Sequence, residues 1–210
     1  MLTRTLLFLF GLMTLASGIA VVTHAGLGTS TISSMAFVLT NAFDLSMGTF
    51  VFLTNVFFFC LQTLVDRTHF LTKFLKQIPI CFVFGIIFDV AFEWTAIVNP
   101  STYALQIFSV LGGSAMMGLG IASMVYARLA ILPPEGFILS IIHRFGGSFG
   151  NLRVALDVSL VLCAALSSWL LLGRIDGLRE GTLIAALTAG QFAKLFLDCL
   201  PHLIPTKQQP

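Results

Sequence analysis

The sequence predicts an all-α membrane protein of six transmembrane helices and two short helices, arranged as two inverted-topology repeats. Three features predict this fold: the composition, the lengths of the apolar segments and an internal repeat. Of the 210 residues, 57% are hydrophobic and 10% are charged, and the mean hydropathy is +0.99. A soluble domain usually carries about 25% charged residues. Because no stretch is polar enough for a separate soluble domain, residues 1–210 are predicted to form a single transmembrane domain.

The apolar segments fall into two length classes. A helix that crosses a bilayer needs about 20 apolar residues. Six segments meet this requirement: 4–24, 47–65, 77–98, 103–127, 151–172 and 181–200. Segments 30–43 and 134–145 are too short, since a helix of about 14 residues covers about 21 Å of a hydrocarbon core about 30 Å thick. We therefore predict that these two form half-helices, which enter the membrane and return.

The second half of the chain repeats the first with a shift of 102 residues, which sets residues 18–56 over residues 120–158. Nine of these 39 positions are identical, and Asn55 lies over Asp157. The two short segments occupy equivalent places. A duplicated apolar chain with short segments in both halves is typical of transporters. The predicted boundaries are about 4–98 for repeat 1 and about 103–200 for repeat 2.

The distribution of Lys and Arg predicts the orientation in the membrane. With both short segments re-entrant, eight cations lie on one side and two on the other. The first group is Arg4, Arg67, Lys73, Lys76, Arg128, Arg144, Arg153 and Lys207, and the second is Arg174 and Arg179. If the short segments crossed, the same charges would divide six against four. The first arrangement predicts a bacterial inner-membrane protein with both termini in the cytoplasm, and its three spans per repeat invert one repeat relative to the other.

The two ends of the chain call for separate interpretation. The N-terminal apolar run resembles a signal peptide, with Arg4 before it. Residues 18–28, however, match residues 120–130, an internal segment that cannot be a signal, so we expect a retained helix. The tail 205–210 is predicted to be disordered.

Nothing in the sequence indicates an enzyme, a nucleic-acid partner, a metal site or a cofactor. The net charge is +2 without a basic stripe, and the four Cys and four His show no metal-ligand spacing. Residues 146–150 fit the G-x-S-x-G nucleophile pattern, but that motif needs a strand-turn-helix context. Because Ser148 aligns with Ser46, both serines are predicted to be helix N-caps.

The short segments form the predicted solute site. Thr29, Ser30 and Thr31 begin the first, and Glu135 lies in the first turn of the second, after a Pro-Pro pair. Helix N-termini near mid-membrane present free N–H groups, which attract an anion or a polar headgroup. If the segments are instead loops at the membrane surface, the hydroxyls only cap helices. Asn55, on the following span, joins the predicted solute site.

Ionisable side chains within the apolar segments are costly and indicate function. Asp157 completes the predicted solute site, whereas Asp89 and Lys194 are predicted to gate transport or couple it to protons. Aligning Gly85 with Gly190 sets Asp89 opposite Lys194, which predicts a charge pair across the pseudo-twofold axis. A pair between Lys194 and Asp157 is the alternative. A structural ion pair that only locks the bundle fits the sequence equally well.

The run from Gly18 to Gly48 contains GLGTSTISSMAFVLTNAFDLSMG, a Gly-Thr start followed by an apolar run that ends in Gly. A similar pattern extends from Gly181-Thr182 to Gly190. The chain resembles the YczE/YyaS/YitT group of bacterial integral membrane proteins. The resemblance implies an inner-membrane protein with five or six spans and supplies no substrate or catalytic residue.

We therefore expect a transporter of a small polar or anionic solute, bound at the interface of the two inverted repeats. The alternative is a non-transporting partner or regulatory subunit of another membrane complex. The transporter predicts a polar cavity between the repeats, whereas the partner predicts a dry, filled centre and an outer face of small residues. The lipid bilayer is the expected environment, and the oligomeric state is left open.

Overall fold

The computed structural model describes residues 2–67, 70–173 and 177–203, which form eight α-helices and contain no strand. The helices are α1 (Leu2–His24), α2 (Thr31–Ala42), α3 (Met47–Val65), α4 (Phe70–Thr95), α5 (Tyr103–Ala127), α6 (Pro133–Phe145), α7 (Phe149–Leu172) and α8 (Glu180–Leu203). All but α2 and α6 are long and apolar enough to cross a membrane. The predicted fold class is confirmed. The tail 205–210 lies outside the described residues.

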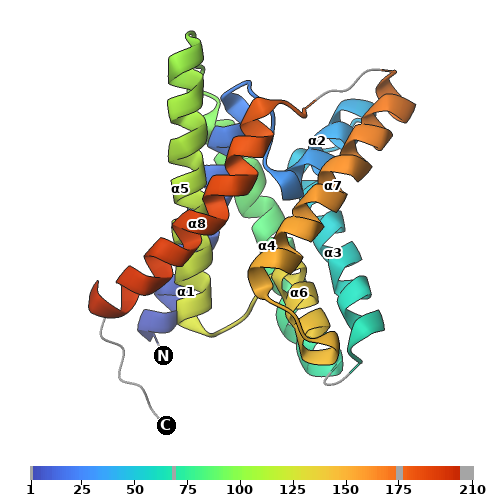
Figure 1. Ribbon diagram of the computed structural model, residues 1–210, viewed down its shortest axis with the longest axis vertical. Helices are drawn as coiled ribbons and strands as arrows, with labels where there is room; N and C mark the ends of the chain where they lie inside the picture. The colour runs from blue at the N-terminus through green and yellow to red at the C-terminus, as the bar shows by residue number, and fades with distance from the viewer. Residues whose placement is uncertain (1, 68–69, 174–176, 204–210) are drawn as a thin grey trace.

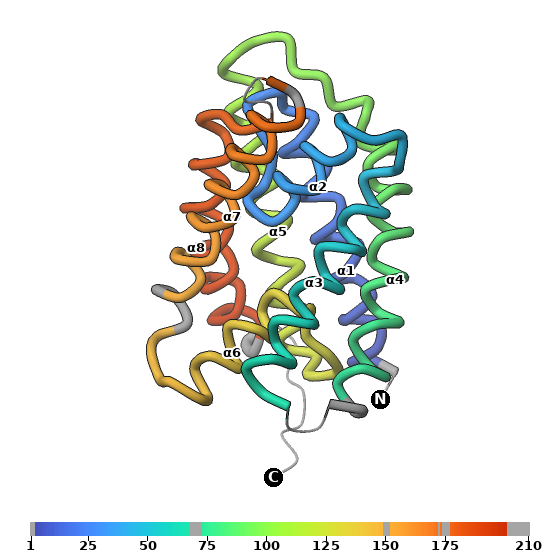
Figure 2. Tube along the Cα trace, turned by 90° about the vertical axis from the view of Figure 1, so that its right-hand side faces the viewer, coloured from blue at the N-terminus to red at the C-terminus, as the bar shows by residue number. Residues whose placement is uncertain are grey.

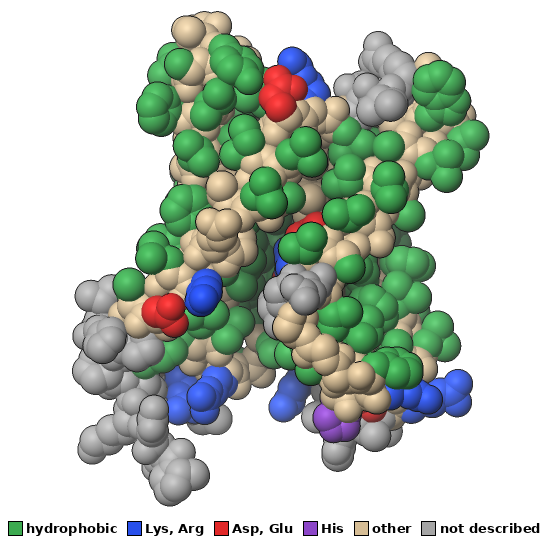
Figure 3. Space-filling view, viewed as in Figure 1, with side chains coloured by type: hydrophobic (Ala, Val, Ile, Leu, Met, Phe, Trp, Pro, Cys, Tyr) green, Lys and Arg blue, Asp and Glu red, His purple; other side chains and the backbone are tan. Residues whose placement is uncertain are grey.

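The two repeats run in opposite directions. Helix α1 begins at the end of the molecule where α8 finishes, and α5 runs antiparallel to α1 (Figure 1). On the face shown in Figure 3, many Lys and Arg side chains gather toward the end at which α1 begins, while hydrophobic side chains cover the middle. This is the surface expected of a membrane-spanning bundle.

Helices α1 and α5 pack closely because glycines lie at their contact. A Cβ added to Gly18 would lie 2.7 Å from the carbonyl oxygen of Gly113, and one added to Gly11 would lie 2.8 Å from that of Gly120. The 102-residue shift sets Gly11 over Gly113 and Gly18 over Gly120, so the two contacts are equivalent under the repeat. Small residues let membrane helices approach closely, and here they place the pseudo-twofold axis between α1 and α5.

The short helices interlock the repeats. Helix α2 of the first repeat packs on α7 of the second, and α6 of the second packs on α3 of the first. The bundle is completed by α4 against α1 and by α8 against α5. Helix α2 occupies one half of the molecule's height and α6 occupies the other (Figure 2). Neither short helix crosses the bundle, which is the arrangement that the segment lengths predict.

Candidate functional site

A chain of buried polar side chains joins the N-terminal ends of α2 and α6. The hydroxyl of Thr31, the first residue of α2, donates to Oδ1 of Asp157 on α7 at 2.8 Å. Arg153, one turn earlier on α7, donates from Nε to Oδ2 of Asp157 at 3.2 Å. Its Nη1 donates to Oε1 of Glu135 on α6 at 2.9 Å. We call these four residues, Thr31, Glu135, Arg153 and Asp157, the central polar cluster.

Local sequence explains how the cluster is positioned. Pro133 and Pro134 suit the first turn of α6, and Glu135 follows near the positive end of the helix dipole. The i,i+4 spacing of Arg153 and Asp157 places both on one face of α7. Only 7% of Glu135 and 6% of Asp157 are exposed. The cluster is therefore enclosed between the two repeats.

Two of the three predicted hydroxyls at the start of α2 have other roles. The backbone N–H of Thr29 donates to the carbonyl oxygen of Gly177 at 2.9 Å, and its hydroxyl donates to the same oxygen at 3.3 Å. Ser30 is the N-cap of α2, because its Oγ accepts from the N–H of Ser33. Only Thr31 reaches the central polar cluster.

Asn55 is buried on α3. Its Nδ2 donates to the carbonyl oxygen of Val51 at 2.8 Å, and its Oδ1 has no hydrogen-bond partner in the described part of the chain. Thus the structure brings together three predicted site residues, Thr31, Glu135 and Asp157. Thr29 instead bonds to Gly177 of the other repeat, Ser30 caps α2, and Asn55 keeps an acceptor without a partner among the described residues.

Arg153 was missed by the sequence analysis, which counted it among the cytoplasmic cations. That assignment is wrong, because its side chain is only 15% exposed and both its partners are buried carboxylates. Without Arg153 the charge count is seven against two, so the predicted orientation is unchanged. The i,i+4 spacing to Asp157 is the sequence feature that pairs them.

Asp89 and Lys194 do not pair in this structure. Asp89 accepts from the hydroxyl of Ser46 at 2.7 Å and from the N–H of Gly48 at 2.6 Å, so it caps the N-terminus of α3. Lys194 is exposed on α8 and forms no hydrogen bond or ion pair with the described residues. Both oxygens of Asp157 are used within the cluster, so the alternative pairing with Lys194 is not formed either. Ser46 is the N-cap of α3, as predicted.

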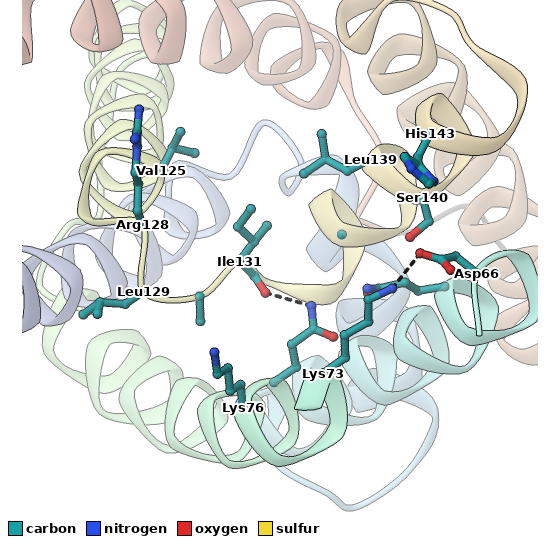
Figure 4. Close-up of a pocket in the computed structure, with 14 residues that line it drawn as sticks. Asp66, Lys73, Lys76, Val125, Arg128, Leu129, Ile131, Leu139, Ser140 and His143 are labelled. Carbon is teal, nitrogen blue, oxygen red and sulfur yellow. Dashed lines mark hydrogen bonds and ion pairs between the residues drawn. The ribbon is translucent and has the colours of Figure 1, made fainter. Parts of the chain in front are cut away.

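A pocket of about 530 Å³ lies between the repeats, beside the end of α3 and the start of α4 (Figure 4). Lys73 donates to Asp66 at 2.7 Å, and Gln77 donates to the carbonyl oxygen of Ile131 at 3.2 Å. Its lining residues are Gln62, Asp66, Lys73, Lys76, Gln77, Val125, Arg128, Leu129, Ala130, Ile131, Gly136, Leu139, Ser140 and His143. Three Lys or Arg against one Asp give the lining a formal charge of +2, with His143 neutral.

The inner part of the pocket carries vacant acceptors. The side-chain oxygens of Gln62 and Gln77 are buried and have no hydrogen-bond partner within the described ranges. A Cβ on Gly136 would lie 2.5 Å from Oε1 of Gln62, so a larger residue there would displace the Gln62 amide. Since Gly136 directly follows Glu135, the pocket extends to the first turn of α6, which carries part of the central polar cluster.

At the opposite end of the molecule the repeats are sealed by their loops. The N–H of Gly181 donates to the carbonyl oxygen of Leu27 at 2.8 Å, and Arg179 donates to that of Gly26 at 3.2 Å. The bonds from Thr29 to Gly177 join the same two loops. Hydrogen bonds therefore join the two repeats at one end of the molecule, and the pocket lies between them at the other end.

Comparison with known proteins identifies the family. The chain belongs to a family of unknown function (DUF6198), whose pattern matches residues 2–198. It is also similar to an uncharacterized protein of Haemophilus influenzae, with 26% identity over 204 residues that cover 94% of this chain and 86% of the relative. No solved structure matches it.

In this family member the two polar regions have opposite charge. The central polar cluster has two carboxylates and one guanidinium, a formal charge of −1. An anion would find no free cation there. It would also find few donors at the start of α6, because Pro133 and Pro134 lack an N–H and the N–H of Gly136 donates to Leu132. The pocket, in contrast, has the charge that attracts an anion.

Proposed function

We propose that this protein transports a small anionic solute across the bacterial inner membrane and binds it in the pocket between the repeats. The observation that carries this proposal is the 530 Å³ cavity lined by cationic and amide side chains from both repeats. Its volume lies within the range of small-molecule sites, about 300–1,000 Å³. The formal charge of +2 favours an anion over a neutral or cationic solute.

The architecture supports transport as well. Inverted repeats with short helices at equivalent places are typical of secondary transporters, whose sites lie at the repeat interface. One sealed end and one accessible pocket correspond to a single state of an alternating-access cycle. The charge count predicts that the pocket faces the cytoplasm. Membership of the YczE/YyaS/YitT group stays a prediction and names no solute.

A second function is favoured by the exposure of α7 and α8. Only 22% of the apolar stretch of each of these helices is buried inside the protein, against 50% for α1 and α5. Such a surface suits a partner or regulatory subunit that packs against another membrane complex. The cavity favours transport, because a purely structural partner has no need of a charged pocket between its repeats.

A ligand screen followed by uptake measurement tests the proposal. A solute that binds only the folded protein raises its melting temperature by mass action. We expect one class of anionic metabolites to raise the melting temperature of the wild type and to raise it less in Lys76→Ala with Arg128→Ala. Lys194→Ala is the matched control, since this lysine lies outside the pocket. Uptake of the same anion into proteoliposomes that is no faster than into empty vesicles would overturn the proposal.

A further inference from the structure

We propose that Glu135 binds and releases a proton in the central polar cluster and that this proton is the coupling ion of transport. The coupling role rests on the proposed function, whereas proton binding itself does not. The sequence pattern predicts coupling at Asp89 and Lys194. The contacts point to the cluster instead, because Asp89 is engaged as a helix cap and Lys194 lies on the exposed side of α8.

The central polar cluster carries one more negative charge than positive charge. Glu135 and Asp157 share a single guanidinium, so a formal charge of −1 remains in a buried site within the membrane-spanning bundle. An uncompensated charge at this depth costs several kcal/mol. Binding one positive charge removes the imbalance, and a proton is the smallest ion that can supply it.

The hydrogen bonds identify the carboxylate that takes the proton. Both oxygens of Asp157 accept a hydrogen bond, one from Thr31 and one from Arg153, so Asp157 is stabilised as an anion. Glu135 accepts at Oε1 from Arg153, but its Oε2 is buried with no donor among the described residues. The proton therefore forms an O–H bond at Oε2, and its release restores the carboxylate and returns the proton to water.

The helices packed around Glu135 present few competing charges. Helix α7 presents Arg153 and Asp157, and the buried Cys81 thiol of α4 lies within electrostatic range of Glu135. Buried side chains of α3 and α2, such as Asn55 and Thr31, are uncharged. The remaining charged groups of α3, α4 and α6 fall into two sets. Asp66, Lys73, Lys76, His143 and Arg144 lie along the pocket or in the last turn of α6. Asp89 and Glu93 lie in the second half of α4, where Asp89 caps α3 and Glu93 is exposed.

The pocket approaches the proton site. Gly136 lines the pocket and directly follows Glu135, so the pocket reaches the helical turn that carries the carboxyl group. Because the solute pocket and the proton site share this turn, occupation of one changes the electrostatic environment of the other. An anion near α6 favours protonation of Glu135, which is the sign that symport of an anion with a proton requires.

Infrared difference spectroscopy on the full-length protein in lipid tests proton binding without any solute. We expect the carbonyl band of a protonated carboxylic acid to appear as the pH is lowered. The band should be lost in Glu135→Gln, kept in Glu135→Asp and unchanged in the control Glu93→Gln, an exposed carboxyl on α4. Asp157→Asn leaves the cluster neutral and should move the band to lower pH. A band unaffected by Glu135→Gln would overturn the proposal.

Two further arms separate the remaining possibilities. The titration is repeated in sodium chloride and in choline chloride, and a band that sodium displaces at constant pH would show a sodium site instead of a proton site. In proteoliposomes, uptake by the wild type should follow an imposed pH gradient and uptake by Glu135→Gln should ignore it. If uptake by the wild type ignores the gradient, coupling is excluded. If the wild type takes up nothing while the band behaves as expected, the transport proposal fails and the proton site stands.

Discussion

The α3–α4 pair of the first repeat is closely packed, whereas the equivalent α7–α8 pair of the second touches little. A Cβ on Gly48 of α3 would collide with the carbonyl oxygen of Gly85 on α4. Gly190 takes the place of Gly85 on α8, and a Cβ there would meet nothing within 4 Å in the described structure. Figure 3 shows the resulting hollow between α7 and α8, with charged side chains visible at mid-height. The equivalent helix pairs of the two repeats are thus packed tightly in the first repeat and separated in the second.

We infer that charge contributes to this difference. Asp89 accepts hydrogen bonds at the N-terminus of α3, where the helix dipole favours an anion. The aligned residue on α8 is Lys194, and a cation is repelled by a helix N-terminus. The pair of helices that carries the acid is closely packed, and the pair that carries the base is not.

The two repeats also divide the chemistry unequally. Glu135, Arg153 and Asp157 all belong to the second repeat. The 102-residue shift sets them over uncharged residues of the first repeat: Ser33, Val51 and Asn55. The second repeat thus supplies every charged residue of the central polar cluster, whereas the first repeat supplies only the Thr31 hydroxyl.

The largest effect is expected from removing the single cation of the cluster. Arg153→Met leaves two buried carboxylates without a cation, which should destabilise the protein by about 3–5 kcal/mol. The triple change Glu135→Ser, Arg153→Val and Asp157→Asn copies the first repeat and should restore the wild-type melting temperature while abolishing uptake. If Arg153→Met melts like the wild type, the two ion pairs of Arg153 do not stabilise the protein.

The next effect concerns the glycine contact between α3 and α4. Gly48→Ala should cost about 1–3 kcal/mol, because the added methyl group overpacks the interface. Gly190→Ala is the matched control in the second repeat and should be neutral or slightly stabilising, since alanine favours the helix by up to about 1 kcal/mol. Thermal melting in one detergent measures both, and equal losses would contradict the asymmetry.

A smaller effect is expected from the cap on α3. Asp89→Asn replaces charge-assisted hydrogen bonds with neutral ones and should cost about 1 kcal/mol. Lys194→Gln should stay within about 0.5 kcal/mol of the wild type. Comparison of their melting temperatures decides whether the two aligned positions differ as the contacts indicate. A loss in Lys194→Gln as large as that in Asp89→Asn would reveal a partner for this lysine.

The smallest effect on stability is expected from a charge reversal on α8, which tests whether charge causes the separation of α7 and α8. Lys194→Asp should change the melting temperature little but draw α8 toward the N-terminus of α7. Spin labels on the exposed native thiols Cys163 and Cys199, with Cys60→Ser to remove a third exposed thiol, report the separation of the two helices. A shorter distance in Lys194→Asp supports the electrostatic cause, and an unchanged distance attributes the gap to packing.

Much of the fold follows from local sequence. The six spans agree closely with the apolar segments, because helix length and hydropathy are properties of contiguous residues. The short segments were recognised by length alone. The candidate site was harder, since Thr31 and Asp157 are far apart in the chain and only packing of α2 on α7 brings them together.

The sequence by itself determined the spans and the duplication and named three of the four residues that meet in the central polar cluster, because these depend on residue type, spacing and internal similarity. Only the tertiary structure decided the partners. It moved Arg153 from the counted surface charges into the cluster and turned Asp89 from a coupling residue into a helix cap. The physical reason is that a buried charge takes whichever partner the packing brings within reach, and two nearly symmetric halves offer each charge several partners that sequence alone cannot rank.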